Sequence, residues 1–192
     1  MNATLVPIGI IGGTGLESLS GLEHVERVSV ETPYGRPSCD PILATLGGYR
    51  VIFIPRHGVS HELAPSRVPY KANLAALKQL GARTVVGTCI AGSLKTEIAP
   101  GSFVIPDQFV NLTWGRDNES IDTEGRFAHL PMGEPYCAAL RAQMIATLRE
   151  ERIPLQEEGV MAIIQGPRFS TRAESRFFIR QGWDVVNMTQ YP

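Results

Sequence analysis

The sequence predicts an α/β fold in which a mixed central β-sheet is flanked by helices. Apolar runs of strand length recur along the chain, and amphipathic stretches of helical length separate them. Several runs are apolar at nearly every position, as in central strands that are covered on both faces. A Gly47-Gly48 pair between two runs predicts a hairpin, so part of the sheet is antiparallel. The predicted strands are 8–11, 27–31, 41–46, 49–55, 83–90, 101–106, 159–164 and 184–188.

Three helices are predicted between these strands, over residues 68–82, 134–152 and 170–182. The first ends at Gly81, a residue suited to the position after a helix end. Pro135 suits the first turn of the second helix, and Ser170 or Thr171 can cap the third. The apolar positions of the first helix, at helical spacing, are Tyr70, Leu74, Leu77 and Leu80.

The composition predicts one cytoplasmic domain over residues 1–192. This length can bury a sizeable core, and 43% of the residues are hydrophobic. The 18 Lys and Arg residues nearly balance the 19 Asp and Glu residues, which argues against nucleic acid or a membrane as a partner. The three cysteines are far apart and predict neither a disulfide framework nor a zinc site. The sequence shows no signal-peptide pattern and no apolar run of membrane-spanning length.

The sequence stops at an unusual place for such a fold. The apolar strand predicted at 184–188 is followed by four residues, so no helix is available to cover it. We therefore expect that the C-terminal part of the domain is missing from this sequence.

The first predicted strand runs into a glycine loop. Its glycines lack the GxGxxG spacing of a dinucleotide site, and the segment after them is too short for the long helix of that motif. The backbone N–H groups of such a loop, together with the Thr14 hydroxyl, suit a single phosphate better. A plain glycine turn is the structural alternative.

Another predicted strand ends in Arg56, His57 and Gly58. A guanidinium offers a planar fork of donors to phosphate oxygens, an imidazole adds a donor, and glycine permits a ligand to approach closely. A solvated surface arginine is the alternative. His57 and His61 have the spacing of a zinc-binding helix, but the residues between them and Pro65 after them argue against such a helix.

Three further predicted strands end in residues that suit a ligand. The stretch 87–94 ends in small residues that leave room for a flat molecule, Phe169 can stack on a base, and Met188 and Thr189 follow the last strand. Ordinary turns and apolar packing, including burial of Cys89, are the alternatives. Because α/β sheets build their sites at the carboxyl ends of strands, we expect all five loops to form one site.

Several motifs together resemble one family. They are IGIIGGTGL, TPYGRPS, PRHG, VPYKANLAALKQLGA, AGSL, PGSFVIPDQFV, HLPMGEPYC, QGPRFSTRAES and NMTQYP. In this order they resemble the methylthioadenosine phosphorylase branch of the trimeric purine nucleoside phosphorylases. The resemblance runs from about residue 8 to residue 192 and implies the fold of that family.

The resemblance implies a pentosyltransferase of purine and methionine salvage. Phosphate would attack the anomeric carbon of 5′-deoxy-5′-methylthioadenosine, giving adenine and 5-methylthioribose 1-phosphate. The family uses inorganic phosphate as co-substrate and no metal or organic cofactor, and it forms homotrimers. Because the transition state is like an oxocarbenium ion, the phosphate is both nucleophile and counter-charge.

The family pattern implies roles for particular residues. Phe169 would pack on the base, Met188 would lie against the ribose, and His129 would reach the 5′-substituent pocket of a neighbouring subunit. Ser170 stands where relatives specific for 6-oxopurines carry Glu, which favours a 6-aminopurine. The phosphate-binding residues would be Thr14, Arg56, His57, Cys89 and Thr189. The nucleoside-binding residues would be Ile90, Ala91, Gly92, Phe169, Ser170, Met188 and His129.

Two departures from the family pattern bear on activity. Cys89-Ile90 stand where the family usually has Thr-Ala, so one hydroxyl contact to phosphate is weaker and there is less space beside the base. The family's acidic or amide residue that assists the leaving purine would lie beyond Pro192, so we identify no catalytic residue within the chain. A polypeptide that ends at Pro192 is expected to show little or no turnover, even where it binds phosphate.

Three other functions stay open at this point. A phosphorylase for 6-oxopurine nucleosides or methylthioinosine would carry very similar motifs. A noncatalytic nucleoside- or phosphate-binding fragment would fit the early stop and the altered stretch 88–92. A nicotinamide-dependent oxidoreductase is supported by the first glycines alone.

Overall fold

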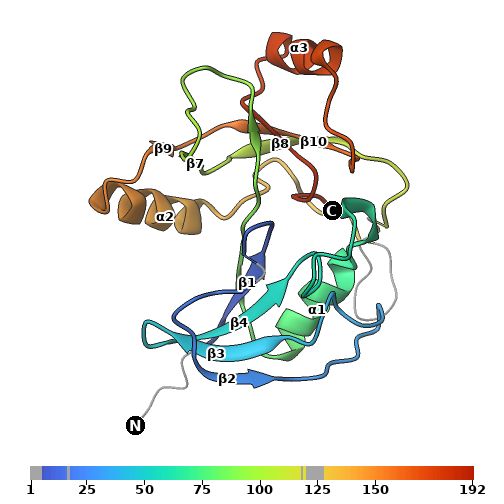
Figure 1. The fold of residues 1–192 in the computed structure, drawn as a ribbon, viewed down its shortest axis with the longest axis vertical. Helices are drawn as coiled ribbons and strands as arrows, with labels where there is room; N and C mark the ends of the chain where they lie inside the picture. Colours follow the sequence, from blue (N-terminus) through green and yellow to red (C-terminus); the bar gives the residue numbers. More distant parts are fainter. Residues whose placement is uncertain (1–5, 17, 118, 120–127) are drawn as a thin grey trace. The chain divides into compact units, whose positions relative to one another are not determined.

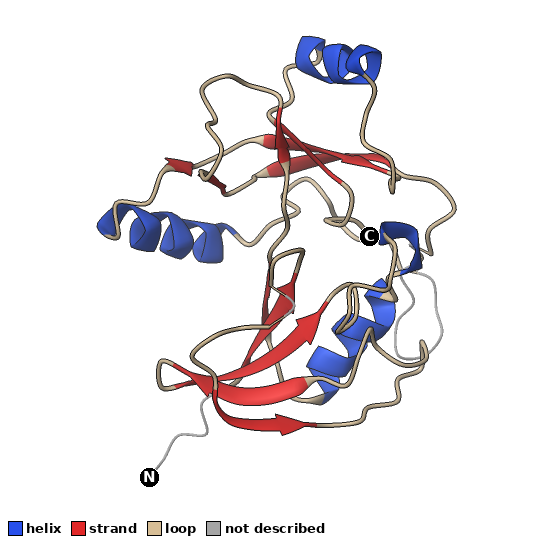
Figure 2. Ribbon diagram, viewed as in Figure 1, coloured by secondary structure: helices blue, strands red, loops and turns tan. Residues whose placement is uncertain are grey.

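The computed structural model describes residues 6–16, 18–117, 119 and 128–192. It contains two compact units, Met1–Ile90 and Ala91–Pro192, and each is described by itself. Both units combine helices with parallel and antiparallel strand pairs (Figure 1, Figure 2), so the predicted mixed α/β fold is confirmed. The single domain over 1–192 stays a prediction. Within the described residues, no helix has the length and apolarity that crossing a membrane requires.

The first unit is built on a five-stranded sheet in the order β2-β3-β4-β1-β5. Strand β1 is parallel to β4 and β5, whereas β3 is antiparallel to β2 and β4. The predicted hairpin is confirmed, since Gly47 and Gly48 join β3 to β4 with φ values of 55° and 83°. The elements are β1 Ile8–Gly12, β2 Glu23–Arg27, β3 Ile42–Leu46, β4 Tyr49–Pro55, the 3₁₀ turn η1 Pro65–Arg67, α1 Tyr70–Gln79 and β5 Thr84–Gly87.

Strand β4 is buried on both faces, which explains its unbroken apolar run. On one face Ile52 and Ile54 pack against Leu77 of α1. On the other face Val51 and Phe53 pack with the buried residues of β3. Figure 2 shows α1 beside these strands. The core therefore holds β4 and α1 together, and β4 carries Arg56 and His57 at its carboxyl end.

Three local predictions in this unit are wrong. The strand expected at 27–31 lies earlier, as β2, because this exposed edge strand has no apolar pattern to mark it. Strand β5 ends at Gly87, three residues earlier than predicted. Leu74 is 47% exposed. The buried face of α1 instead consists of Ala72, Asn73, Ala76 and Leu77, and its small side chains let the helix approach the sheet closely.

The second unit has a four-stranded sheet in the order β6-β11-β10-β8 and a two-stranded sheet of β7 and β9. Strand β10 is parallel to β8 and β11, and β11 is antiparallel to β6. Figure 1 shows α2 and α3 on opposite sides of β8 and β10. The elements are β6 Gly92–Ser93, β7 Phe103–Val104, β8 Gln108–Leu112, α2 Ala138–Glu150, β9 Leu155–Gln156, β10 Val160–Ile164, α3 Arg172–Arg180 and β11 Val185–Asn187.

The predicted start and end of α3 are confirmed. Thr171 is the cap: its hydroxyl accepts from the Glu174 N–H, and the Glu174 carboxylate accepts from the Thr171 N–H. Gly182 follows the helix with φ 80°. Phe178 is buried against Ala162 of β10, which fixes the helix on the sheet.

Two predictions in the second unit are wrong. Helix α2 begins at Ala138 with Cys137 as its cap residue, so Pro135 lies before the helix rather than in its first turn. The strand expected at 101–106 is reduced to β7, and β8 follows it unpredicted. Strand β8 is half polar and comes directly after Pro106-Asp107, so neither its periodicity nor its flanks separate it from a loop.

Candidate functional site

The carboxyl ends of β1, β4 and β5 meet at one edge of the first unit's sheet. In the parallel register Gly12 lies beside Pro55, and Ile11 lies beside Gly87. The loops that leave these strands begin with Gly13-Thr14, Arg56-His57 and Thr88-Cys89. Such an edge is where α/β sheets place ligands, so the predicted convergence is confirmed for these three loops.

Gly13 sits where a side chain has no room. A Cβ atom there would lie 2.6 Å from the Thr88 carbonyl oxygen, 2.9 Å from the Arg56 Nη1 atom and 3.1 Å from the Cys89 Cα atom. The Gly13 N–H donates to the Thr88 hydroxyl at 3.2 Å. The glycine therefore permits the three loops to pack against one another. Thr14, the next residue, is exposed.

The guanidinium of Arg56 is buried at this edge. Arg56 is 4% exposed, and its Nη1 donates to the Thr88 carbonyl at 2.7 Å. No carboxylate forms an ion pair with Arg56 among the residues that the structure describes. Burial lowers the pKa of Arg56, because removing a cation from water disfavours its charged form. A buried cation without a carboxylate partner is costly, so the site favours a bound anion.

His57 is buried beside Arg56, and its tautomer is fixed by geometry. Its Nδ1 lies 2.7 Å from the Leu63 carbonyl oxygen, which can only accept, so Nδ1 carries the proton and donates. The ring stacks on His61 with centroids 4.5 Å apart and planes 23° apart. The imidazole is therefore held in place by the loop that follows β4.

Cys89 and Ile90 differ in exposure. Cys89 is half-buried, and burial raises the pKa of its thiol more strongly than the nearby Arg56 charge lowers it. The thiol is therefore protonated at neutral pH, in keeping with the absence of any sequence signal for a nucleophile. Ile90 is 69% exposed and leaves its side chain open to a ligand or another surface.

Thr189 lies in a well-defined turn of the second unit. The side-chain oxygen of Asn187 accepts from the N–H groups of Thr189 and Gln190, at 2.7 and 2.9 Å. Arg116 donates to the carbonyl oxygens of Met188, Tyr191 and Gln165 at 2.8, 2.5 and 3.0 Å. These contacts fix Met188 and Thr189. Sequence reasoning missed both supporting residues, although an Asn two positions before Thr189 is typical of an Asx turn.

The loop before α3 presents Phe169 to solvent. Phe169 is 85% exposed, which leaves its ring open to stacking. Arg168 is paired with Glu174 through two bonds of 2.8 Å. The Ser170 hydroxyl lies 2.8 Å from the Ser175 hydroxyl.

Ala91 and Gly92, also in the second unit, are exposed. A Cβ atom at Gly92 would lie 3.2 Å from a methyl group of Val186, so β6 approaches β11 closely there. The structure brings together Gly13-Thr14, Arg56-His57 and Thr88-Cys89 in the first unit. The predicted residues from Ala91 onward lie in the second unit and are described within it.

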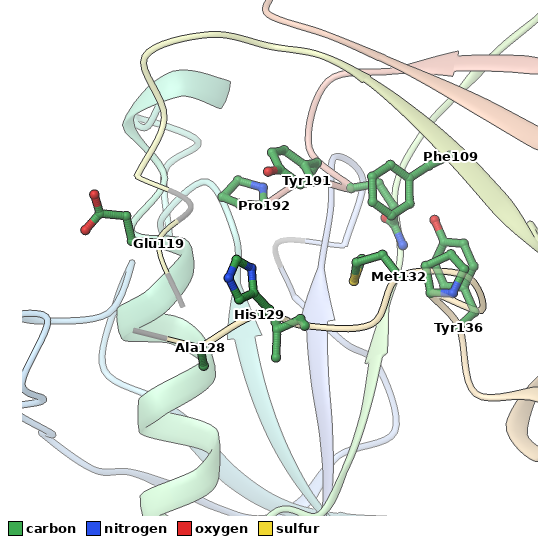
Figure 3. A pocket seen from close by; sticks show the side chains of 11 residues that line it. Phe109, Glu119, Ala128, His129, Met132, Tyr136, Tyr191 and Pro192 are labelled. Atoms are coloured by element: carbon green, nitrogen blue, oxygen red, sulfur yellow. The ribbon is translucent and has the colours of Figure 1, made fainter. Parts of the chain in front are cut away.

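His129 lines a pocket of about 470 Å³ in the second unit. Figure 3 shows His129 and Met132 around this space together with Phe109, Tyr136 and Tyr191. The Phe109 ring contacts both tyrosine rings, with centroids 6.3 and 5.6 Å apart. The pocket is therefore largely aromatic and apolar. Its remaining lining residues are Glu119, Ala128, Leu130, Pro135, Gln190 and Pro192.

Among the described residues, no group of three or more His, Cys, Asp or Glu side chains could hold a metal ion. The residues that converge on β1, β4 and β5 instead supply donors, namely a guanidinium and backbone N–H groups. Donors of this kind recognise phosphate oxygens.

Comparisons with known proteins agree with this geometry. The chain is 48% identical to S-methyl-5′-thioadenosine phosphorylase of Mycolicibacterium smegmatis, over 96% of this chain and 68% of that protein. It is 41% identical to purine nucleoside phosphorylase of Streptomyces coelicolor, over 100% of this chain and 70% of that protein. Methylthioadenosine phosphorylase from Schistosoma mansoni in complex with adenine has a TM-score of 0.90 at 36% identity, over 96% of this chain and 74% of that chain. Residues 7–192 match the family model of the phosphorylase superfamily, and the chain belongs to that superfamily.

Proposed function

We propose that this protein catalyses phosphorolysis of 5′-deoxy-5′-methylthioadenosine. The phosphate oxygen forms a bond to the anomeric carbon while the bond from that carbon to the adenine nitrogen breaks. Adenine leaves with a proton, and 5-methylthioribose 1-phosphate is the second product. The observation that carries the proposal is the buried Arg56 guanidinium, which has no ion-paired carboxylate among the described residues and lies at the ends of three parallel strands.

The residues proposed to bind phosphate are Thr14, Arg56, His57, Cys89 and Thr189. The guanidinium supplies charge and a planar pair of donors, and the backbone at Gly13 lies close to it. Phosphate held in this way is a positioned nucleophile. Its negative charge also stabilises the positive charge that develops on the sugar ring. The thiol of Cys89 is a weaker donor than a hydroxyl, so Cys89 contributes less than the other side chains.

The proposed nucleoside site uses the exposed ring of Phe169 against the base and Met188 against the ribose. Ile90, Ala91, Gly92 and Ser170 are proposed as further residues that contact the purine. Ser170 lacks the carboxylate that would accept a proton from a 6-oxopurine, so adenine is the favoured base. The exposed Ile90 narrows the space beside that base.

His129 belongs in this proposal to the 5′-substituent pocket of a neighbouring subunit in a homotrimer. The enzyme would act in the cytoplasm, in purine and methionine salvage.

The test is a product assay with the native gene product. We expect methylthioadenosine and phosphate to give equal amounts of adenine and sugar 1-phosphate, with no reaction when phosphate is left out. Inosine and methylthioinosine serve as the comparison substrates. Faster cleavage of either one would favour a 6-oxopurine phosphorylase, and ligand binding without product would indicate a noncatalytic protein.

A further inference from the structure

Asn73 of α1 has a buried carboxamide whose oxygen and nitrogen both bond to one residue. Asn73 is 1% exposed, the lowest value of the buried polar residues that the structure describes. Its Oδ1 accepts from the Ser38 N–H at 2.8 Å, and its Nδ2 donates to the Ser38 hydroxyl at 2.9 Å. A backbone N–H can only donate, so this pair of contacts fixes the orientation of the amide. The helix thereby holds a residue that lies 35 positions away in the chain.

Ser38 passes this constraint on to Arg56. Its hydroxyl has a single proton, and the Asn73 amide already donates to the hydroxyl oxygen. The proton is therefore directed to the Arg56 carbonyl oxygen, 2.7 Å away. The result is a chain of donors with one direction, from Asn73 through Ser38 to Arg56.

The carbonyl that accepts this bond belongs to the peptide plane between Arg56 and His57. The backbone torsions on either side of that plane, ψ of Arg56 and φ of His57, set how the two side chains are directed relative to each other. The Arg56 N–H is fixed separately, by donation to the Gly12 carbonyl at 2.8 Å. The Ser38 bond therefore restrains these torsions directly after β4 has ended, in addition to the bond from the Leu63 N–H to the His57 carbonyl.

We propose that Asn73 and Ser38 are positioning residues for the phosphate site, holding the Arg56–His57 peptide so that both side chains face the anion. This inference rests on the proposed function of Arg56 in phosphate binding. A buried amide in a helix costs free energy unless both of its ends are satisfied, and an apolar residue could fill the same volume. Here the oxygen and the nitrogen of the amide are both hydrogen-bonded to Ser38, and Ser38 in turn bonds to Arg56.

Two variants interrupt the chain of donors in different ways. Ser38→Ala removes the hydroxyl. Asn73→Asp keeps the shape and the acceptor for the Ser38 N–H, but its second oxygen cannot donate. The Ser38 proton then turns to the carboxylate, and the Arg56 carbonyl loses its donor. Ser38→Thr keeps the hydroxyl and serves as the conservative rescue.

The readout is phosphate affinity, measured by calorimetry with the native gene product, together with the KM values for phosphate and nucleoside. We expect Ser38→Ala and Asn73→Asp to weaken phosphate binding about threefold to tenfold, the size of one hydrogen bond. The KM for the nucleoside should stay unchanged, and Ser38→Thr should bind phosphate as the wild type does. Leu77→Ala, one turn along the same helix face, is the control for lost stability and should leave phosphate affinity unchanged.

The variant Arg56→Gln distinguishes a failure of the proposed phosphate site from a failure of the positioning role alone. If Arg56→Gln binds phosphate as tightly as the wild type, the proposed phosphate site is wrong and this inference falls with it. If Arg56→Gln is weak while Ser38→Ala and Asn73→Asp bind normally, the positioning role alone is overturned. If Asn73→Asp does not fold, the comparison of Ser38→Ala with Ser38→Thr decides the question.

Discussion

Gly13→Ala tests whether the packing at the strand ends controls phosphate binding. The new methyl group would lie 2.6 Å from the Thr88 carbonyl oxygen and 2.9 Å from the Arg56 Nη1 atom. Those two atoms form a hydrogen bond of 2.7 Å, so the methyl group is forced against both partners of that bond. The guanidinium must then move away from the carbonyl that positions it.

The expected losses of folding stability and of phosphate affinity follow from two effects of this displacement. Overpacking of a filled site costs about 1–3 kcal/mol of folding stability. A hydrogen bond to a charged group is worth about 1.5–3 kcal/mol, which corresponds to about 10- to 150-fold weaker phosphate binding when Arg56 is misplaced. The second effect is the specific one, because a general loss of stability does not change the affinity of molecules that remain folded.

The assay is calorimetric titration of phosphate into the folded variant, with a urea unfolding curve for its stability. Gly81→Ala is the matched control: Gly81 has φ 96° after α1, so alanine there is strained, but Gly81 lies near the amino-terminal ends of β1 and β5. We expect Gly81→Ala to lose stability and to keep its phosphate affinity. Phosphate binding by folded Gly13→Ala that equals the wild type would refute the assignment of Arg56.

Four further predictions concern the site, the core, a helix end and the thiols. Thr14→Ala should raise the KM for phosphate much more than the KM for nucleoside, and equal effects on both would count against its assignment. Leu77→Ala should lower the free energy of unfolding by about 2–5 kcal/mol, whereas exposed Leu74→Ala should change it by less than about 0.5 kcal/mol in the same denaturation assay. The side-chain bonds from its arginine partner lower the pKa of Glu174 from its ordinary 4.5 to about 2, so the stabilisation of α3 is fully present above pH 4.5 and is lost as the pH falls through about 2. Hydrogen exchange of α3 amides should show this loss, and Glu174→Gln should remove its pH dependence. A thiol reagent at pH 8 should modify exposed Cys137 first, and the other two cysteines only after unfolding, because burial raises the pKa of both; rapid reaction of all three in the folded protein would contradict this.

Local patterns were sufficient for much of the fold. The length and nearly continuous apolar character of the runs marked β1, β3, β4 and β10, and the glycine pair marked the hairpin. The end of α1 shortly before Gly81 and the start of α3 after its cap residue Thr171 followed from residues whose preferences act within one turn. These signals depend only on residues that are close together in the chain, so they can be read from the sequence.

Local patterns failed where burial is decided by distant contacts. Strand β2 is exposed along its whole length, so its pairing with β3 leaves no apolar pattern in the sequence. Leu74 and Leu77 have equal apolar character, but only Leu77 faces β4. Which of the two leucines is buried depends on how α1 packs against the sheet. The helical spacing of the apolar residues does not show it.

The sequence by itself identified the residue types for an anion site, with glycine, threonine, arginine and histidine at the ends of apolar strands. Its motif order also indicated the family that the comparisons confirmed. The tertiary structure decided which partners hold those residues: Thr88 binds the loop at Gly13 across 75 residues, and Asn73 acts on Arg56 through Ser38. A strand's periodicity reports which faces are buried, whereas a hydrogen bond between distant loops depends on sheet order and register. Those are properties of the folded chain, and no single segment carries them.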